Sequence, residues 1–438
     1  MYRQQRFEEL LVGKRVLIAG YGREGRSTHT LIQHWVPADS ITVVCNDDEI
    51  FSALAHARNE GRAYDLIVKS PGIPTAKFEG RCKPDTLTSQ TDLFMQVYGD
   101  LTIGVTGTKG KSTTTSLIYH VLSQSKGREH HVILAGNIGT PLFDIVEQLD
   151  EGSIVVAELS CHQLENIHRA PHVGVILNLF QEHLDHYRDY RDYQLAKMQM
   201  MLKQQASDHS FYCTDNRDLV ERVRELRPHI AATLHPYSLH DAHRAAIDPL
   251  QTTLKGDHNL SNIFVAKQVC ALMGVTDGSF AEALATFKGL PHRLELVGTY
   301  HGITFYNDSI STIPQATIAA MKALNDVETL ILGGYDRGID YGALVSFLAL
   351  PPASLHHIAF VGEAGRRILA DLSNSHHGLT DSIQILQTDD YRAIVDWCFN
   401  VTSEGKICLL SPAAASYDSF KNFEERGETF KQLVRTHL

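Results

Sequence analysis

Residues 104–115 read GVTGTKGKSTTT, and this stretch decides the fold class. An apolar strand is expected before it and a helix from Lys111 onward, with a glycine-rich turn between them. Successive backbone N–H groups in such a turn form a concave anion site, and the helix N-terminus adds partial positive charge. Gly107 and Gly110 allow the backbone to approach phosphate groups closely. We expect Lys111 to reach the terminal phosphates of a nucleotide and the Ser112 hydroxyl to hold Mg²⁺. A glycine-rich turn without a ligand is the alternative.

The composition is that of an ordinary globular protein, 43% apolar and 21% charged over 438 residues. This length predicts roughly two to four domains, each with its own core. The formal net charge of −11 argues against a general nucleic-acid binder, which would be basic. Seven cysteines without a CxxC pair indicate reduced thiols. We recognise no signal peptide in residues 1–12 and no apolar run long enough to span a bilayer, so we expect a cytoplasmic protein without membrane association.

Short β-branched runs alternate with helical stretches, which predicts an α/β fold with parallel sheets covered by helices on both faces. The expected strands are Arg15–Ala19, Ile41–Cys45, Leu66–Lys69, Leu101–Val105, Val132–Ala135, Ile154–Leu159, Val173–Leu177, Leu330–Leu332, Ile358–Val361 and Ile407–Leu410. The pattern breaks near residues 99–100 and again near 289–292, after which a β-rich run begins. We therefore expect three α/β domains, residues 1–98, 99–290 and 291–438.

The first domain opens with a G-x-G-x-x-G turn at Gly20, Gly22 and Gly25, after a strand and before a helix. This arrangement is typical of a Rossmann-like domain that binds a pyrophosphate, and a nicotinamide-dependent dehydrogenase is the obvious alternative. The acidic pair Asp47-Asp48 ends the next strand, where a carboxylate can bind a ribose hydroxyl. Residues 70–74, SPGIP, close the third strand and taken alone predict only a turn.

The phosphate loop is shorter than the common P-loop. Its form TGTKGKST, at residues 106–113, resembles the ATP-binding loop of the Mur ligases, which build the peptide stem of the bacterial cell wall. Folylpolyglutamate synthases share this loop, and the other motifs extend the Mur ligase resemblance over nearly the whole chain. The resemblance implies a Rossmann-like first domain that binds a UDP-sugar, a central P-loop ATPase-like domain and a Rossmann-like C-terminal domain that binds an amino acid. It also implies a reaction in which ATP converts a carboxylate into an acyl phosphate that an amine attacks, with Mg²⁺ at two sites.

Two strand-end motifs predict where the metal binds. Glu158, in AELSCHQLE (157–165), ends an apolar strand beside the phosphate loop, where a carboxylate can hold Mg²⁺. His183 lies in NLFQEHLDH (178–186), whose composition also permits a zinc site of His183, Asp185 and His186. The resemblance makes Glu158 and His183 ligands of Mg²⁺ instead. Cys161 and His162 stand where the family has Ser-Phe, and we interpret both as packing changes.

Lys197 lies near the start of an apolar helical run, where a solvated lysine is the plain interpretation. Its spacing from His183 matches the Mur ligase lysine that CO₂ carbamylates. Carbamylation turns a cation into an anion and so creates a Mg²⁺ ligand. The implied catalytic residues are Lys111, Glu158, His183 and Lys197, and the implied metal ligands are Ser112, Glu158, His183 and carbamylated Lys197.

The resemblance assigns further residues to the substrates, motif by motif. The implied ATP contacts are Gly107, Thr108, Lys109, Gly110, Lys111, Ser112 and Thr113 in the loop, Asn259 and Asn262 near the adenine, Arg293 at the γ-phosphate and Asp308 at the ribose. The implied contacts of the UDP-sugar substrate are Gly22, Asp47, Ser70, Pro71, Gly72, Asn137, Ser160 and Gln163. The implied contacts of the amino acid are Thr312, Arg337, Ser416 and Phe423.

Two C-terminal motifs, GGYDRG (333–338) and LSPAAASYDSFKNFEERG (410–427), look most like those of the D-glutamate-adding members of the family. This implies UDP-N-acetylmuramoyl-L-alanine and D-glutamate as substrates of a monomeric enzyme. The sequence departs from that pattern at Ile310 and Ile313, where the family has Lys and Asn. Because the missing lysine would face the α-carboxylate of the amino acid, a relative that adds L-glutamate or another amino acid stays open. A non-catalytic UDP-sugar-binding protein would be expected to lack Lys111 or Glu158, and both are present.

Overall fold

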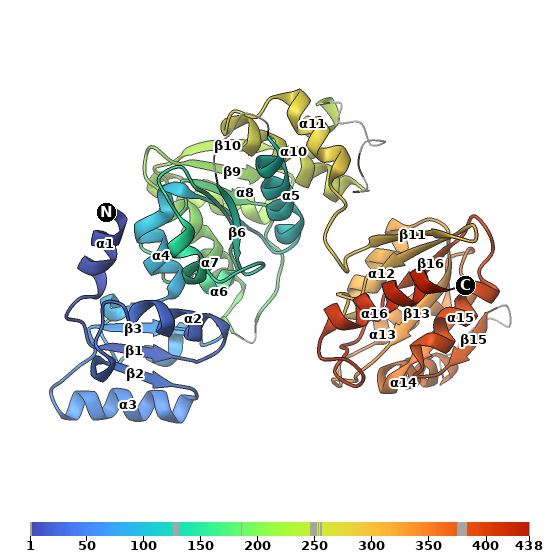
Figure 1. Cartoon of the computed structure of the whole chain (residues 1–438), viewed down its shortest axis with the longest axis horizontal. Helices are drawn as coiled ribbons and strands as arrows, with labels where there is room; N and C mark the ends of the chain where they lie inside the picture. The colour runs from blue at the N-terminus through green and yellow to red at the C-terminus, as the bar shows by residue number, and fades with distance from the viewer. Residues whose placement is uncertain are drawn as a thin grey trace. The chain divides into compact units, whose positions relative to one another are not determined.

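The computed structural model describes residues 2–125, 131–184, 186–245, 252, 254, 256–374 and 383–437. The chain forms two compact units (Figure 1): unit 1 comprises Met1–Thr252 and Asp257–Phe287, and unit 2 comprises Thr253–Gly256 and Lys288–Leu438. Among these described residues, unit 1 contains two sheets and unit 2 contains one. No helix within the described ranges is long and apolar enough to cross a membrane.

The first sheet of unit 1 has four parallel strands in the order β2-β1-β3-β4. The strands are β1 (Val16–Ala19), β2 (Ile41–Val44), β3 (Leu66–Lys69) and β4 (Leu87–Thr88), and the helices are α1 (Tyr2–Leu11), α2 (Arg23–Ile32), α3 (Asp47–Asn59) and α4 (Gln90–Tyr98). Helix α4 is almost wholly buried because it contacts α1 and α2 as well as α6 (Cys161–Leu164), which belongs with the second sheet.

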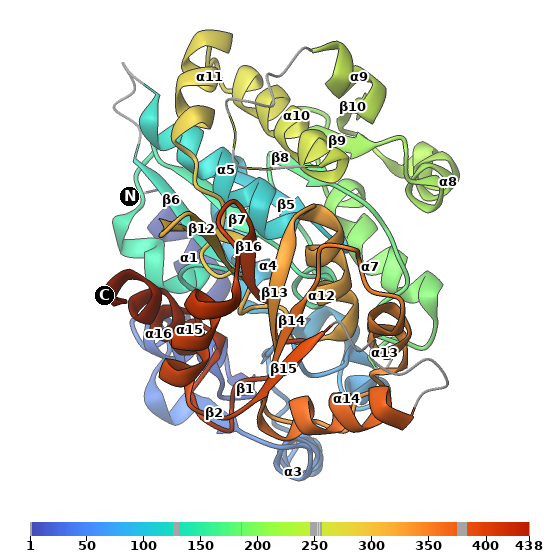
Figure 2. The same cartoon turned by 90° about the vertical axis from the view of Figure 1, so that its right-hand side faces the viewer.

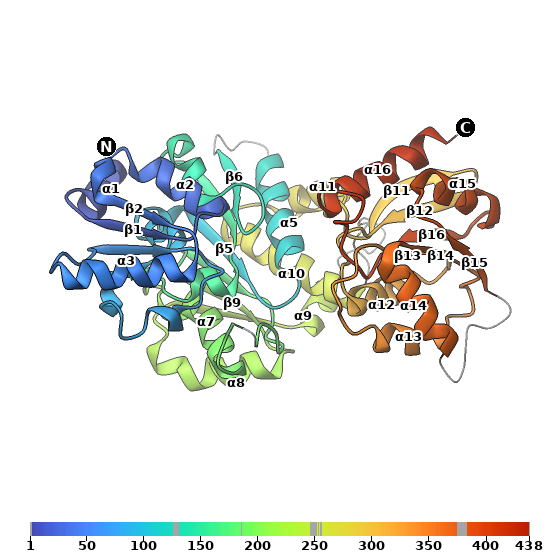
Figure 3. The ribbon, with the colours of Figure 1, turned by 90° about the horizontal axis from the view of Figure 1, so that it is seen from below.

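The second sheet of unit 1 has six parallel strands in the order β10-β9-β8-β5-β7-β6. The strands are β5 (Thr102–Thr106), β6 (Val132–Gly136), β7 (Ile154–Glu158), β8 (Val173–Ile176), β9 (His209–Cys213) and β10 (Thr233–Tyr237). The helices are α5 (Lys111–Gln124), α6 (Cys161–Leu164), α7 (Tyr190–Leu202), α8 (Arg217–Leu226), α9 (Leu239–Arg244), α10 (Asp257–Leu272) and α11 (Asp277–Thr286). Helices α5 and α10 lie side by side (Figure 3).

One apolar core joins the two sheets of unit 1. It combines Val16 of β1 with Val155 of β7, and Phe94 of α4 belongs to the same cluster. Burial of this shared surface is favourable in proportion to the apolar area removed from water, which holds both sheets in one unit. The division of the chain into domains at residues 99 and 291 stays a prediction.

Unit 2 has a six-stranded sheet in the order β11-β12-β16-β13-β14-β15. The strands are β11 (Glu295–Tyr300), β12 (Ile303–Asn307), β13 (Val327–Gly333), β14 (His357–Val361), β15 (Gln384–Gln387) and β16 (Ile407–Leu410), and the helices are α12 (Pro314–Ala323), α13 (Gly342–Ala349), α14 (Gly362–Asn374), α15 (Tyr391–Val401) and α16 (Phe423–Thr436). Alternate residues of β13 face opposite cores: Leu330 belongs to the core that includes residues of α12, α13 and α14, and Ile331 to the core that includes residues of α15 and α16. Helices α15 and α16 lie on the other side of this sheet from α12 and α13 (Figure 2).

The predicted α/β class, with parallel sheets and helices on both faces, is confirmed. The exception is β11, which runs antiparallel to β12. All the expected strands are present, with shifted ends at several of them. Strands β4, β9, β10 and β15 were not predicted, and three of them (β4, β10 and β15) lie at the edge of a sheet.

Candidate active site

The phosphate loop connects the carboxyl end of β5 to the first residue of α5. Gly107 and Gly110 have φ angles of +148° and +86°, which side chains rarely allow. A Cβ atom at Gly107 would lie 2.9 Å from Leu177 Cβ, so the loop is also too close to β8 for a larger residue. The first ladder hydrogen bond of α5 runs from Thr114 N to Gly110 O. The N–H groups of residues 111–113 therefore lie outside the helix ladder, where they can bind an anion.

Asn178 braces this loop, a role that the sequence analysis missed. Its Oδ1 accepts hydrogen bonds from Thr108 N at 3.1 Å and Lys109 N at 2.8 Å, and its Nδ2 donates to Lys109 O at 3.1 Å. Two N–H groups that were expected to face phosphate are thus engaged within the protein. The available signal was the position of Asn178 at the end of β8, the strand beside β5.

Two lysines meet on one carbonyl of the loop. Lys111 Nζ donates to Gly107 O at 3.0 Å and to Thr108 O at 3.0 Å, and Lys197 Nζ donates to Gly107 O at 2.9 Å. Lys197 is only 1% exposed, so its interpretation as a solvated helix lysine is wrong. Burial lowers the pKa of Lys111 and lowers that of Lys197 to about 7.

Tyr193, one turn before Lys197 on α7, completes the floor of this site and was also missed. Its hydroxyl lies 2.7 Å from Thr108 Oγ1, and the centre of its ring lies 5.0 Å from Lys197 Nζ. Tyr193 is fully buried. Its ring therefore excludes water from the amine of Lys197 and contributes to the burial that favours the neutral form.

Glu158, the last residue of β7, pairs in register with Val105 of β5 and Gly136 of β6. It is 1% exposed, and its Oε1 accepts a hydrogen bond of 2.6 Å from Asn137 Nδ2. Its Oε2 is buried without a hydrogen-bond partner among the described residues. An unpaired carboxylate oxygen beside a phosphate loop suits a hard cation such as Mg²⁺.

The donor set fits a metal held jointly with a nucleotide. No group of three or more His, Cys, Asp or Glu side chains in the described part of the chain is placed to hold a metal by itself. This does not test the zinc alternative of His183, Asp185 and His186, because Asp185 lies outside the described residues. Glu158, Ser112 and His183 would have to be joined by phosphate oxygens and a carbamate, which matches the preference of Mg²⁺ for such ligands.

His183 lies in the segment between β8 and α7 with a left-handed backbone, φ +57°. Its side chain is exposed, and its ring centre lies 4.8 Å from that of His162. His162 also packs on the ring of His186 at 4.2 Å. His162, which we interpreted as a packing change, thus places a second imidazole ring against the ring of His183.

Among the predicted UDP-sugar residues, Gly22 belongs to the glycine-rich turn of the first sheet and Ser70 contacts it. Ser70 Oγ donates to Gly20 O at 3.0 Å, and a Cβ atom at Gly25 would lie 2.1 Å from Gly20 O. Gly22 is the N-cap of α2, and Pro71 and Gly72 follow β3 in the turn that begins at Ser70. Asp47 does not end a strand, as expected, but begins α3 and pairs with Lys77. Asp47 lies there because Asn46 caps the helix, and acidic residues in a first turn favour the helix dipole.

Ser160 and Gln163 form a capping box at the start of α6, with Ser160 N donating to Gln163 Oε1 at 2.9 Å. Gln163 Nε2 donates to Glu24 Oε1 at 2.7 Å. Glu24 lies within the G-x-G-x-x-G turn, and the sequence analysis gave it no role. This contact fastens the glycine-rich turn of the first sheet to α6 of the second.

The predicted adenine residues lie in the first turns of α10. Asn262 is buried, and a Cβ atom at Gly110 would lie 2.8 Å from its Oδ1. Asn259 Oδ1 lies 3.5 Å from Asn262 Nδ2. The structure thus brings Asn262 against the phosphate loop within unit 1.

In unit 2, Asp308 follows β12 and is 3% exposed. Its carboxylate accepts hydrogen bonds from Ser311 Oγ at 2.5 Å, Ser411 Oγ at 2.7 Å and Leu294 N at 3.1 Å. Burial raises the pKa of Asp308 to about 6 against these hydrogen bonds. The carboxylate that we expect to contact the ribose therefore already accepts three hydrogen bonds within the protein. Arg293, which we expect at the γ-phosphate, is exposed.

The predicted amino-acid residues form a second group in unit 2. Arg337 Nη2 donates to Thr312 O at 3.0 Å, which brings two of them together. Ser416 is buried, and Phe423 begins α16 and accepts a hydrogen bond of 2.8 Å at its carbonyl from Ser309 Oγ.

Arg426, which the sequence analysis missed, ties these segments together. It is buried and donates to Ser309 O at 2.8 Å, Ala414 O at 3.0 Å and Ala415 O at 3.1 Å. One guanidinium therefore fixes the segment after β12 to the segment after β16, using the fork of donors that arginine carries.

Known proteins resemble this chain over nearly its whole length. Residues 105–270 match the Mur ligase middle domain. A UDP-N-acetylmuramoylalanine–D-glutamate ligase of Desulfitobacterium hafniense is 33% identical over 97% of this chain and 98% of its own length. The chain belongs to the Mur ligase family. A protein of the same name from Bacillus cereus is 29% identical over 96% of this chain and 97% of its own length.

Solved structures of Mur ligases share the fold. The MurF ligase from Thermotoga maritima in complex with ADP is 16% identical, with a TM-score of 0.55 over 98% of this chain and 96% of its own. A MurF from Acinetobacter baumannii is 15% identical, with a TM-score of 0.57 over 98% of this chain and 92% of its own. The resemblance drawn from the motifs is confirmed, and this Mur ligase is an ATP-dependent enzyme that forms an amide bond. The dehydrogenase alternative is set aside.

Proposed function

We propose that this Mur ligase joins D-glutamate to UDP-N-acetylmuramoyl-L-alanine in the cytoplasm, as a monomer, with ATP and Mg²⁺. The observation that carries the proposal is the arrangement at the end of β5. There, the phosphate loop, the unpaired oxygen of Glu158 and the buried amine of Lys197 share one polar centre. The near full-length likeness to proteins named as D-glutamate ligases supports the choice of substrates.

The reaction divides into two displacements. A carboxylate oxygen of the alanine attacks the γ-phosphorus of ATP, the bond to the β-phosphate oxygen breaks, and an acyl phosphate and ADP result. The neutral amine of glutamate then attacks the acyl carbon, the bond to the phosphate oxygen breaks, and an amide, phosphate and a proton are released. The first displacement brings anionic groups together, so the site must supply positive charge.

The phosphate loop supplies that charge through residues 107–113. The N–H groups of Lys111, Ser112 and Thr113 are free of the helix ladder and would bind the phosphates. Lys111 must leave Gly107 O to reach the γ-phosphate, and its half-buried ammonium then neutralises the charge that develops there.

Mg²⁺, when bound at its two sites, neutralises the phosphates and orients the γ-phosphoryl group. Ser112, Glu158, His183 and Lys197 are the side chains that would hold it. Lys197 can do so only as a carbamate, and only a neutral amine attacks CO₂. The pKa of about 7 that burial gives Lys197 supports this modification, because an ordinary lysine would be almost fully protonated at neutral pH.

Unit 2 is proposed to choose the amino acid, through Thr312, Arg337, Ser416 and Phe423. Arg337 has the planar fork that grips a carboxylate at two points. The L-glutamate-adding alternative stays under test because Ile310 removes the lysine expected at the α-carboxylate.

The proposal is tested by measuring phosphate release and the mass of the product with ATP, Mg²⁺ and UDP-N-acetylmuramoyl-L-alanine. D-Glutamate and L-glutamate are compared side by side at equal concentrations. We expect phosphate release and a product heavier by one glutamyl group with D-glutamate. A preference for L-glutamate would support the alternative, and release with neither amino acid would refute both.

A further inference from the structure

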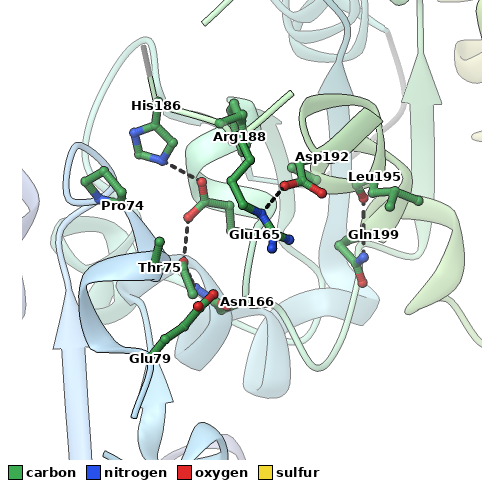
Figure 4. Close-up of a pocket in the computed structure, with 13 residues that line it drawn as sticks. Pro74, Thr75, Glu79, Glu165, Asn166, His186, Arg188, Asp192, Leu195 and Gln199 are labelled. Carbon is green, nitrogen blue, oxygen red and sulfur yellow. Dashed lines mark hydrogen bonds and ion pairs between the residues drawn. The ribbon is translucent and has the colours of Figure 1, made fainter. Parts of the chain in front are cut away.

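The segment that carries His183 is attached to α6 by a contact between two nearly buried side chains. His186 Nε2 donates to Glu165 Oε1 at 2.6 Å, and both side chains are 9% exposed (Figure 4). Glu165 is the residue that follows α6, two residues after Gln163 of the capping box. A short bond between a carboxylate and an imidazole in such a dry place is strong and directional.

The other oxygen of Glu165 is bound to the first sheet of unit 1. Lys69 Nζ, at the end of β3, lies 2.9 Å from Glu165 Oε2, and Thr75 Oγ1 donates to the same oxygen at 2.8 Å. Lys69 also donates to Ile73 O at 3.0 Å. Glu165 therefore connects the 70–75 turn, which is assigned to the UDP-sugar substrate, with the segment that carries His183.

His183 needs this support because its backbone is strained. Its φ of +57° is uncommon for a residue other than glycine, and such a conformation persists only where the surroundings enforce it. Two hydrogen bonds of 3.1 Å enforce it here, from His186 N and from Tyr187 N to His183 O. Both donors belong to the stretch that Glu165 holds through the His186 ring.

We propose that His186 is a positioning residue: by bonding to Glu165, it holds the left-handed turn at His183 and so fixes where the His183 imidazole stands. The inference rests on the proposed function, in which His183 is a ligand of Mg²⁺. A partner that orients a ligand from behind commonly changes metal affinity or activity by about 10- to 100-fold when it is removed. His186 is suited to the experiment because its replacement leaves the Lys69–Glu165 pair intact, whereas removal of Glu165 would leave a buried ammonium unpaired.

The test compares two replacements of similar size. In His186→Gln the side-chain amide can still donate to Glu165, and in His186→Leu it cannot. Arg188→Ala is the control. Arg188 lies in the same segment, but it is exposed and pairs with Asp192 in the first turn of α7. Each variant is assayed for kcat, for the KM of each substrate, and for Mn²⁺ affinity by electron paramagnetic resonance with a non-hydrolysable ATP analogue.

We expect His186→Leu to lower kcat and weaken Mn²⁺ binding by about 10- to 100-fold while the KM for glutamate stays within about twofold. His186→Gln should recover most of both losses, and Arg188→Ala should match the wild type. Equal behaviour of the Gln and Leu variants would overturn the inference. If the wild type ligates neither glutamate, the proposed function fails, and the Mn²⁺ titration still decides the role of His186.

Discussion

Lys111 Nζ and Lys197 Nζ donate hydrogen bonds to the same atom, the carbonyl oxygen of Gly107, at 3.0 and 2.9 Å. Two ammonium groups on one acceptor repel each other. Burial is the main cause of the lowered pKa of Lys197, and the positive charge of Lys111 lowers that pKa further. Triphosphate binding at Lys111 and carbamylation of Lys197 each add negative charge to this place. Because these two anionic groups would repel each other, both can be held here only with cations between them, which the ammonium of Lys111 and Mg²⁺ would supply.

Replacement of Lys111 separates the ATP chemistry from substrate binding. Lys111→Ala should reduce phosphate release by about 100- to 1,000-fold, since it removes a cation that acts on developing charge. Binding of the UDP-sugar substrate, measured by calorimetry without nucleotide, should be unchanged. Lys406→Ala is the matched control because that lysine of unit 2 is partly exposed, pairs with Asp326 and has no part in the proposed site. Near-normal turnover of Lys111→Ala would contradict the assignment of the loop.

Replacement of Lys197 tests the carbamate. Lys197→Ala should be nearly inactive and should recover part of its activity in acetate, because a free carboxylate can replace the carbamate at Mg²⁺. Full activity without acetate would show that Lys197 takes no part in the reaction.

The pH dependence of CO₂ uptake by the wild-type enzyme gives a second test of Lys197. With a pKa of about 7, roughly half of the amine is neutral at pH 7 and roughly nine-tenths at pH 8. In CO₂-depleted buffer, reactivation by bicarbonate should become more complete as the pH rises from about 6 to 8. Activity that ignores both bicarbonate and pH over this range would argue against carbamylation.

Burial of Asp308 makes the stability of unit 2 depend on pH. Its folded pKa of about 6 lies above the unfolded value of 3.8, so the folded state binds more protons between these values. The free energy of unfolding should fall as the pH rises through this window, by about 3 kcal/mol from this group. Trp397 of α15 reports on unit 2 if Trp35 is replaced by Phe. Asp308→Asn in that background should lose the dependence, and parallel curves for the two proteins would show that another group causes it.

Replacement of Arg337 tests the amino-acid site. Arg337→Ala should raise the KM for glutamate by about 10- to 100-fold, the equivalent of a charge-assisted hydrogen bond of roughly 1.5–3 kcal/mol. Ile310→Lys should change it far less. Arg366→Ala, an exposed arginine of unit 2 that pairs with Asp389, is the control. A larger effect at residue 310 than at Arg337 would move the carboxylate contact to the segment after β12.

The sequence predicted most interior strands, but it missed β9 inside the second sheet and the edge strands β4, β10 and β15. Strands such as β5 and β7 are buried along their whole length and read as apolar runs. Strand β15, with the sequence QILQ, is mostly exposed at a sheet edge, and its polar residues do not follow the apolar pattern that predicts a strand. Strand β10 contains His235 and Pro236, which a central strand would not tolerate.

Among the site residues, local motifs predicted the loop glycines, Glu158 and Lys197, but not the residues that brace them. Asn178 contacts Lys109, which lies 69 residues earlier, and Arg426 contacts Ser309, which lies 117 residues earlier. Their partners are mostly backbone atoms, which any residue type supplies. No spacing within one motif could therefore reveal them, and the fold alone brings them together.

The acyl phosphate is the central claim, and oxygen transfer tests it most directly. UDP-N-acetylmuramoyl-L-alanine labelled with ¹⁸O in the alanine carboxylate is incubated with ATP, Mg²⁺ and D-glutamate, and the released phosphate is analysed by mass spectrometry. The account predicts one ¹⁸O atom in each released phosphate, because the acyl C–O bond breaks when the amine attacks. Unlabelled phosphate alongside normal product would contradict it, since the carboxylate oxygen would then never have been bonded to phosphorus.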